Sequence, residues 1–303
     1  MSGLLGISIV NYRSAADTAG LIRSIVTGRT TGPQAAGPQA AGPRVAIAIV
    51  DNSDQTAELS EIAGSAERAG VTVRVIAGHG NVGYAAGNNL AATWLLAEGA
   101  DVIWVLNPDT RIVGGGLASA LDVLRAGDRA IGATASVAPG GGPGGGPDLG
   151  MVDLWTGQSG RPPASGVAGA SKLVYAAGHS LLVTRRAWQD LGGFSEDFFL
   201  FYEEADIALR AARLGIPTTA VPDLAVEHTG GVATGATADM TVKSTTAYFH
   251  ASRSCMVFFR KHYRHRVPFA AAARLGYAAK ALLARRPDAA TAVIRGTVAG
   301  LRA

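Results

Sequence analysis

Residues 102–109, VIWVLNPD, join a short apolar run to a polar turn. Continuous apolar runs of this length are typical of parallel strands that are covered on both faces. Three more such runs precede it and predict strands at 4–10, 45–50 and 71–76. A helical pattern follows each of the four predicted strands, at 15–27, 55–69, 84–97 and 115–126. This alternation predicts an α/β fold with a mostly parallel, doubly wound sheet, whose ligands bind beyond the carboxyl ends of the strands.

The second half of the chain is less regular. It contains predicted helices at 187–191, 203–214, 240–263 and 269–286, a strand at 217–221, and a break at Pro268. Two stretches rich in glycine and proline, near 28–44 and 139–147, cannot bury enough surface to fold and are interpreted as insertions. We therefore expect one α/β domain over residues 1–238 and a helical C-terminal extension over 239–303.

The composition excludes several classes of protein. Of the 303 residues, 48% are hydrophobic and 17% are charged, which supplies a core and rules out a wholly disordered chain. No apolar run reaches the ~18 residues of a membrane-spanning helix, and the N-terminus lacks a secretory pattern, so we expect a cytoplasmic protein. The single cysteine, Cys255, excludes an intramolecular disulfide and is expected to be a small buried hydrophobe.

Positive charge is concentrated at the C-terminal end. The formal net charge is only +4, but residues 260–303 carry ten Lys and Arg and a single acid, Asp288. This segment suggests contact with anionic lipid headgroups or another acidic surface, a dimer face, or simply a solvated positive face. Because aromatic residues do not alternate with the basic ones, nucleic acid is not an expected partner.

Polar side chains follow two of the predicted strands. Asp51 and Asn52 follow one strand, and Asn107, Pro108 and Asp109 follow another. These positions meet at the edge of the sheet that binds ligands, where carboxylates and amides can hold a base and a hard cation. Each alone is also compatible with a helix cap or an Asx turn, and it is their combination that favours a functional site.

The segment from Gly78 to Gly83, GHGNVG, has the spacing G-x-G-x-x-G. Taken alone, this spacing would indicate a dinucleotide-binding oxidoreductase. However, it follows the third strand rather than the first, and no acidic residue ends the next strand where a ribose would be held. We instead expect a tight turn in which Asn81 and backbone N–H groups face a ligand at the N-terminus of the next helix.

The densest signal is residues 192–206, GGFSEDFFLFYEEAD. Acidic residues favour the first turn of a helix, and this role is sufficient for Asp206. The neighbouring Glu203 and Glu204 point in different directions, so one of them can face a pocket as a general base. Further on, His228 stands in the segment EHTGG and is open to two readings, a structural histidine or a metal ligand together with Asp109.

Taken in order, six segments resemble the inverting family 2 glycosyltransferases of the GT-A fold, in particular the rhamnosyltransferase-like branch that builds bacterial surface glycans or decorates natural products. The matching segments are ISIVNY (7–12), VDNS (50–53), NVGYAAGNN (81–89), LNPDT (106–110), residues 192–206 and HTGG (228–231). The resemblance covers about residues 4–235 and identifies 1–238 as a catalytic domain.

The resemblance implies a nucleoside diphosphate sugar as donor, with UDP, dTDP or GDP as the nucleotide and rhamnose or another deoxysugar as the candidate sugar. Tyr12 would lie near the nucleobase, and Asp51 would bind its imide edge. Asp109 corresponds to the last acid of the family's D-x-D motif and would hold Mg²⁺ or Mn²⁺, with His228 as a second ligand. The complete implied donor site is Val10, Tyr12, Asp51, Asn81, Gly83, Asn107 and Asp109.

The resemblance also assigns the reaction. Glu204 stands at the place of the catalytic base, usually Asp, with Glu203 as the fallback, and Gly178, His179 and Trp155 are implied acceptor contacts. The acceptor would be a hydroxyl of a surface glycan, a lipid-linked intermediate or a natural product, met at the inner face of the membrane if the basic extension binds lipid. Asn107 and Glu204 depart from the usual pattern, so the alternative is a catalytically weakened relative that only binds a nucleotide sugar.

Overall fold

The computed structural model describes residues 3–30, 43–137, 146–163, 169–228 and 244–303. The predicted insertions lie largely outside these ranges, as do residues 229–231 of the HTGG segment. The chain forms two compact units, each assembled from separate segments. The sheet unit contains Met1–Asp148, Ala176–Phe194 and Arg210–Thr229, and the helical unit contains Leu149–Tyr175, Ser195–Leu209 and Gly230–Ala303.

The sheet unit is built on eight strands in the order β3-β2-β1-β4-β10-β6-β11-β5. Its strands are β1 (Leu4–Asn11), β2 (Arg44–Asp51), β3 (Thr72–Ile76), β4 (Val102–Leu106), β5 (Thr110–Gly114), β6 (Ile131–Val137), β10 (Ser180–Thr184) and β11 (Thr218–His228). The first four pair in parallel, whereas β10 is antiparallel to both of its neighbours. The parallel half is the one that the apolar runs predict, and the α/β fold is confirmed.

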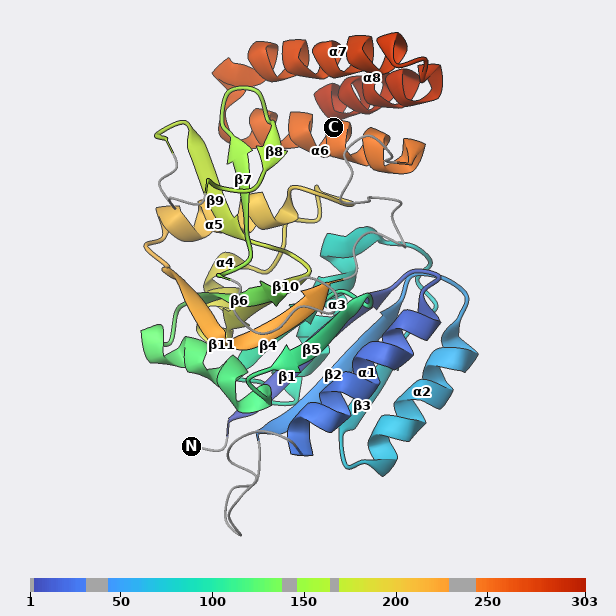
Figure 1. Cartoon of the computed structure of the whole chain (residues 1–303), viewed down its shortest axis with the longest axis vertical. Coiled ribbons are helices and arrows are strands. Elements are labelled where there is room, and N and C mark those ends of the chain that lie inside the picture. Colours follow the sequence, from blue (N-terminus) through green and yellow to red (C-terminus); the bar gives the residue numbers. More distant parts are fainter. Residues whose placement is uncertain (1–2, 31–42, 138–145, 164–168, 229–243) are drawn as a thin grey trace. The chain divides into compact units, whose positions relative to one another are not determined.

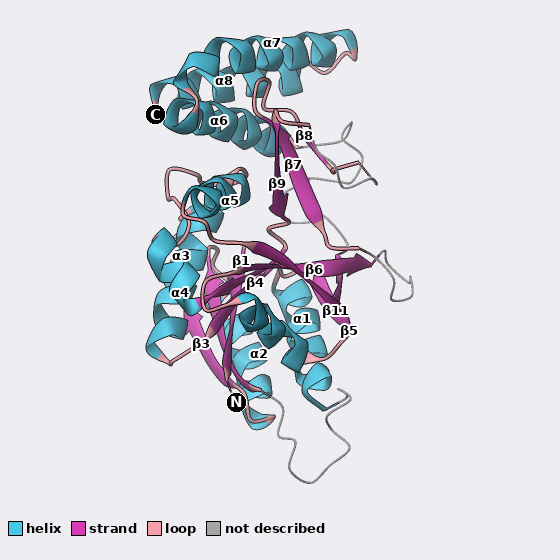
Figure 2. Cartoon of the chain, turned by 90° about the vertical axis from the view of Figure 1, so that its left-hand side faces the viewer, coloured by secondary structure: helices cyan, strands magenta, loops and turns pink. Residues whose placement is uncertain are grey.

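Helices cover both faces of this sheet, as Figures 1 and 2 show. Helices α1 (Ala15–Thr30) and α2 (Thr56–Arg68) lie on one face, and α3 (Gly83–Ala97) and α4 (Arg185–Leu191) lie on the other. Gly87 lets α3 approach β1, because a Cβ there would lie 3.0 Å from the side chain of Val10. The predicted helix over 115–126 is instead a 3₁₀ segment, η1 (Leu117–Ala126).

The helical unit combines a three-stranded sheet with the C-terminal helices. The strands are β7 (Leu149–Asp153), β8 (Ser159–Gly160) and β9 (Lys172–Ala176), and the helices are α6 (Thr245–His262), η2 (Arg264–Arg266), α7 (Val267–Leu283) and α8 (Pro287–Arg302). Helix α5 (Glu203–Arg213) begins in this unit. Cys255 is fully buried in the core beside Met256, Phe258 and Phe259, as expected.

Two predictions for the C-terminal helices need correction. The break between α6 and α7 lies at residues 263–266, and Pro268 stands in the first turn of α7 rather than in the break. Proline fits there because the first N–H groups of a helix have no partner within it. The predicted helix over 269–286 ends at Leu283, and α8 was not predicted at all. In the part of the chain that is described, no helix is long and apolar enough to cross a bilayer.

Candidate functional site

The carboxyl ends of β1 and β2 bring Asn11 and Asp51 together. These residues are register partners in the parallel pair, and both are fully buried. The Asn11 amide donates to Gln55 Oε1 at 3.2 Å, and its Oδ1 accepts from Ser14 and Thr18, at 3.1 Å each. The sheet edge therefore ends in a fixed polar network. Asn11 belongs to the ISIVNY segment but was not predicted as a site residue.

Asp51 is held by its own chain. Its Oδ1 accepts from the backbone N–H of Ser53 at 2.9 Å, and Oδ2 accepts from Thr56 Oγ1 at 2.7 Å. Burial raises the pKa of this carboxyl, but the hydrogen bonds outweigh burial and hold the pKa below its ordinary value. The carboxylate is thus ionised and forms an Asx turn with the backbone of Ser53. Its Oδ2 can accept a second hydrogen bond, because a carboxylate oxygen carries two lone pairs.

The turn before α3 places amides and backbone at a helix N-terminus. Asn81 Oδ1 accepts from Gly83 N–H at 3.0 Å, and the carbonyl of Gly83 accepts from Asn52 Nδ2 at 2.9 Å. Gly83 has a backbone φ of +86°, a conformation that glycine adopts easily and that residues with a Cβ atom disfavour. Asn52 also lies 3.2 Å from His79 Nε2. The G-x-G-x-x-G segment is therefore a turn tied to the end of β2, as the sequence predicts.

Val10 and Tyr12 flank Asn11 at the end of β1. Val10 is buried against α3, whereas the Tyr12 ring is 37% exposed and has the guanidinium of Arg13 at 5.4 Å from its centre. Arg13 has φ +53°, so the chain turns sharply here. An exposed ring beside a fixed polar edge offers a surface on which a planar base can pack.

Asp109 and His228 converge from different strands. Asp109 lies in the turn between β4 and β5, and His228 ends β11, where it pairs with Thr110 of β5. Asp109 Oδ1 lies 3.3 Å from His228 Nε2, and both side chains are largely buried. The predicted strand over 217–221 extends to residue 228, and this extension is what delivers the histidine.

Two further residues extend this pair into a cluster. The His179 ring stacks on the His228 ring with 4.1 Å between centres and 11° between planes, and its Nε2 lies 3.0 Å from Asp148 Oδ2. His179 is fixed at this position because its carbonyl accepts from Asn107 N–H, and the neighbouring Gly178 carbonyl accepts from Tyr84. Sequence reasoning missed Asp148. The four residues Asp148, His179, His228 and Asp109 are called the Asp–His cluster below.

The Asp–His cluster favours the charged form of Asp109. Burial raises the pKa of this carboxyl, but His228, a backbone N–H and His179 lower it by more, so the pKa lies below its ordinary value. Among the described residues, His228 Nε2 is buried without a hydrogen bond of good geometry. A carboxylate oxygen and an imidazole nitrogen that converge in this way are a donor set that fits a divalent cation. Within the described ranges, no group of three His, Cys, Asp or Glu side chains is placed to hold an ion.

Glu203 and Glu204 open helix α5 in different environments. Glu203 is 2% exposed, and its Oε2 has no hydrogen-bond partner among the described residues. Burial, together with the charges of Glu204 and Asp206, raises the pKa of Glu203 well above its ordinary value. Glu204 is half-buried. Burial and the charges of the two glutamates also raise the pKa of the Tyr175 hydroxyl.

The turn before Glu203 has unusual backbone geometry. Phe201 and Tyr202 have φ of 68° and 72°, in the left-handed region. Tyr202 is held in place because its hydroxyl donates to the Gly157 carbonyl and its carbonyl accepts from Asp206 N–H. Asp206 is fully buried and lies 2.7 Å from His262 Nε2, so its role exceeds the helix-dipole contact that the sequence predicts.

The third predicted acceptor residue, Trp155, belongs to the helical unit, where it lies on the β7–β8 turn. It is 40% exposed, packs edge-on against Phe269, and carries the Arg266 guanidinium over its ring.

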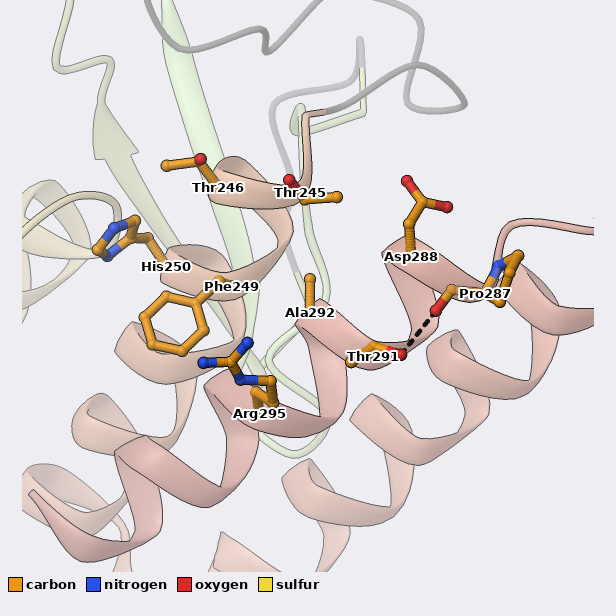
Figure 3. A pocket seen from close by; sticks show the side chains of 9 residues that line it. All are labelled: Thr245, Thr246, Phe249, His250, Pro287, Asp288, Thr291, Ala292 and Arg295. Atoms are coloured by element: carbon orange, nitrogen blue, oxygen red, sulfur yellow. Dashed lines mark hydrogen bonds between the residues drawn. The ribbon is translucent and has the colours of Figure 1, made fainter.

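A pocket of about 600 Å³ opens between α6 and α8 of the helical unit, and Figure 3 shows its lining. None of the predicted site residues lines this pocket; its walls are Thr245, Thr246, Phe249, His250, Pro287, Asp288, Thr291, Ala292 and Arg295.

Comparison with known proteins identifies the fold. The chain matches no protein-family model and no curated protein sequence. Among solved structures it is similar to S. aureus TarS 1-349 in complex with UDP-GlcNAc, with a TM-score of 0.51 and 14% identity over 97% of this chain and 81% of that one. It is also similar to GalNAc-T7 with UDP, GalNAc and Mn²⁺, with a TM-score of 0.55 and 14% identity. That match covers 74% of this chain and only 43% of GalNAc-T7. The sheet and its helices thus have the GT-A nucleotide-diphospho-sugar transferase fold.

Proposed function

We propose that this protein is an inverting glycosyltransferase that moves a sugar from a nucleoside diphosphate to an acceptor hydroxyl. The observation that carries the proposal is the convergence of Asp109 and His228 in the same GT-A unit that places Asn11 and Asp51 at its strand ends. The two solved structures described above hold UDP with GalNAc and Mn²⁺ in one case and UDP-GlcNAc in the other, which supports a nucleotide sugar as donor. The rhamnosyltransferase-like resemblance favours a deoxysugar such as rhamnose.

The donor binds along the strand ends of the sheet unit. The base packs near Tyr12 and Val10, and its imide N–H donates to Asp51 Oδ2, which already accepts from Thr56. An imide N–H is present in uracil, thymine and guanine, so UDP, dTDP and GDP all satisfy this contact. Asn81 and the N–H groups at the start of α3 face the nucleotide, where a helix N-terminus favours phosphate.

Asp109 and His228 would hold a divalent cation, Mg²⁺ or Mn²⁺. When bound, the cation would supply positive charge that stabilises the leaving diphosphate. Asn107 stands at the position of the first acid of the D-x-D motif. Its backbone N–H donates to the His179 carbonyl at 3.0 Å and so holds His179 in place. His179 stacks on the His228 ring, so we assign His179 as a positioning residue for the ligand rather than an acceptor contact alone.

Glu204 is the base that takes the proton of the acceptor hydroxyl. Glu203 does not suit this role, because its carboxyl is almost fully buried and cannot meet an acceptor hydroxyl. Glu204 is half-buried and can therefore reach an acceptor. The acceptor oxygen attacks the anomeric carbon on the face opposite the departing diphosphate, so the configuration inverts. Gly178, His179 and Trp155 remain proposed acceptor contacts.

The proposed catalytic region is residues 1–238, which includes the segments 149–175 and 195–209 of the helical unit, and the proposed extension is residues 239–303. The acceptor is a hydroxyl of a surface glycan, a lipid-linked intermediate or a natural product, and the extension is the candidate face for a homodimer. We place the protein in the cytoplasm, with the extension at the inner face of the membrane.

The test begins with donor binding. Thermal unfolding is followed with UDP, dTDP, GDP and their sugars, each with and without Mn²⁺ or Mg²⁺, because a ligand stabilises the native state according to its affinity. We expect one nucleotide to raise the melting temperature in a metal-dependent way, and Asp109→Asn to abolish the metal dependence. The donor found in this way is then used for transfer and hydrolysis assays.

Transfer separates the enzyme from a weakened relative that only binds. Loss of a general base costs about 10² to 10⁴ in rate, so Glu204→Gln is expected to lose transfer while it keeps the donor-induced shift. Glu196→Gln, an exposed neighbour in the chain, is the matched control. Wild-type turnover by Glu204→Gln contradicts the assignment, and binding without any turnover by the native protein supports the weakened relative.

A further inference from the structure

Helix α7 exposes an apolar face. Its exposed positions recur three and four residues apart, and they carry Pro268, Phe269, Ala272, Leu275, Gly276, Ala279, Lys280, Leu282 and Leu283. Lys280 is the sole charged residue among these exposed positions of α7. Phe269, Leu275 and Leu282 are 55 to 57% exposed and Leu283 is 85% exposed, which is unusual for large side chains on one helix.

This face is the outer side of a packed helix. The opposite side of α7 buries Ala270 in the core of the helical unit and Ala278 against Ala290 and Val293 of α8. Figure 1 shows α7 beside α8 at the edge of this unit. The exposed leucines therefore lie on the side of α7 that faces away from the core of the helical unit.

Aromatic and basic residues border the apolar face. At one end, Trp155 packs edge-on against Phe269 at 5.3 Å, and the Arg266 guanidinium lies 4.3 Å from the Trp155 ring. At the other end, Lys280 and Arg285 are exposed near Leu283 in the sequence. Residues 264–286 contain no acidic residue. An apolar strip with a basic rim and an aromatic residue at its edge is the pattern of a helix that lies in a bilayer interface.

We propose that the face formed by Phe269, Leu275, Leu282 and Leu283, with Trp155 at its edge, docks onto an anionic lipid surface. The positive rim complements acidic headgroups, and the leucines enter the headgroup and acyl boundary. A second copy of the chain fits less well, because a two-fold contact through α7 would bring the acid-free rims of both copies together. This inference rests on the proposed membrane contact of the extension and not on the sugar-transfer reaction.

Vesicle binding of the full chain tests the proposal without donor or acceptor. Vesicles of phosphatidylcholine with about one third phosphatidylglycerol are compared with vesicles of phosphatidylcholine alone. Leu282→Ser with Leu283→Ser is expected to weaken binding to the anionic vesicles at least tenfold, because two leucines lose their apolar burial. Lys280→Gln with Arg285→Gln is expected to weaken it about 25-fold at low salt, since each cation near such a surface contributes about fivefold.

Matched control variants distinguish vesicle binding through this face from non-specific adsorption to vesicles. Leu214→Ser and Arg68→Gln alter an exposed leucine in the turn after α5 and an exposed arginine of α2, and both are expected to bind like the native chain. Quenching of tryptophan fluorescence by brominated lipid, lost in Trp155→Phe, gives a readout of the aromatic edge. Circular dichroism checks that the serine variant is folded.

Two results overturn the proposal. One is equal vesicle binding by the native chain and the Leu282, Leu283 variant. The other is a native dimer that this variant converts to a monomer while neither binds vesicles, which would make the face an interface between copies. Transfer to a water-soluble acceptor is measured separately without vesicles, so failure of the lipid proposal leaves the glycosyltransferase proposal standing, and the reverse also holds.

Discussion

Glu203→Gln is expected to change how the stability of the protein depends on pH. The native carboxyl is 2% exposed, Oε2 lacks a hydrogen bond within the described residues, and Glu204 and Asp206 add negative charge nearby. Its pKa is therefore well above the ordinary value of 4.5 in the folded protein, whereas the unfolded chain ionises at its usual pH. Between the two pKa values the native state binds one proton more than the unfolded state, so stability falls as pH rises.

The size of the effect follows from one proton. Stability changes by about 1.4 kcal/mol per pH unit within that window. For a chain of 303 residues the unfolding entropy is about 0.6 kcal/mol/K, so each pH unit inside the window lowers the melting temperature by about 2 °C. Glutamine has the shape of the protonated glutamate and no charge, so the variant lacks this loss and becomes relatively more stable as pH rises above about 5.

The assay is urea unfolding of both proteins in steps from pH 5 to pH 8, compared as a difference at each pH. Groups that titrate identically in both proteins, histidines included, cancel in that difference. Glu204→Gln removes one of the negative charges that raise the pKa of Glu203. The variant is therefore expected to lose stability over a narrower pH range than the native protein, but still to lose some. Stability curves for the native protein and Glu203→Gln that run parallel from pH 5 to pH 8 would refute the reasoning.

Three other expectations test the cluster, the α5 turn and the α3 turn. His179→Ala removes the ring that stacks on His228 and is expected to weaken metal-dependent nucleotide binding about tenfold in thermal-shift titrations, with His179→Phe affected less because it keeps the stack. Asp206→Asn breaks a buried pair with His262 and is expected to cost about 3 to 5 kcal/mol in urea unfolding, with a smaller cost when His262→Gln is added. Gly83→Ala forces a side chain into φ +86° and is expected to cost about 1 to 2 kcal/mol by the same measurement.

Strands β1, β2 and β4 could be predicted because each is buried along almost its whole length and therefore reads as an apolar run. Two of the missed strands lack that signal: β5 is largely half-exposed, and β8 has only two residues. Helix α8 was missed for a different reason. Gly296 and Gly300 disfavour a helix by propensity, but a Cβ at these positions would lie 2.2 Å and 2.3 Å from backbone oxygens of α6. These glycines allow the close packing of α8 on α6, which local sequence does not reveal.

The positions of Asp51 and Asp109 could be predicted because both follow strands that end at the same edge. The remainder of the Asp–His cluster depends on pairings between distant segments. His228 reaches Asp109 because β11 pairs with β5, and His179 reaches His228 because β10 lies beside β4. Asp148 stands alone after a glycine-rich stretch, with no periodic neighbours to mark it. For these residues the sequence indicates only that Asp and His are residue types able to bind a metal ion.

The choice between Glu203 and Glu204 depends on contacts far from both in the sequence. Adjacent residues on a helix point about 100° apart, so a shift of one residue at the start of α5 would exchange the buried and the half-buried glutamate. The start is fixed by Phe201 and Tyr202, whose left-handed backbone costs about 1 to 2 kcal/mol per residue. Tyr202 offsets this cost through its burial against Phe258 of α6 and its hydrogen bond to Gly157. The C-terminal helices therefore do more than supply a basic surface, because their core determines which glutamate is buried and which is half-buried.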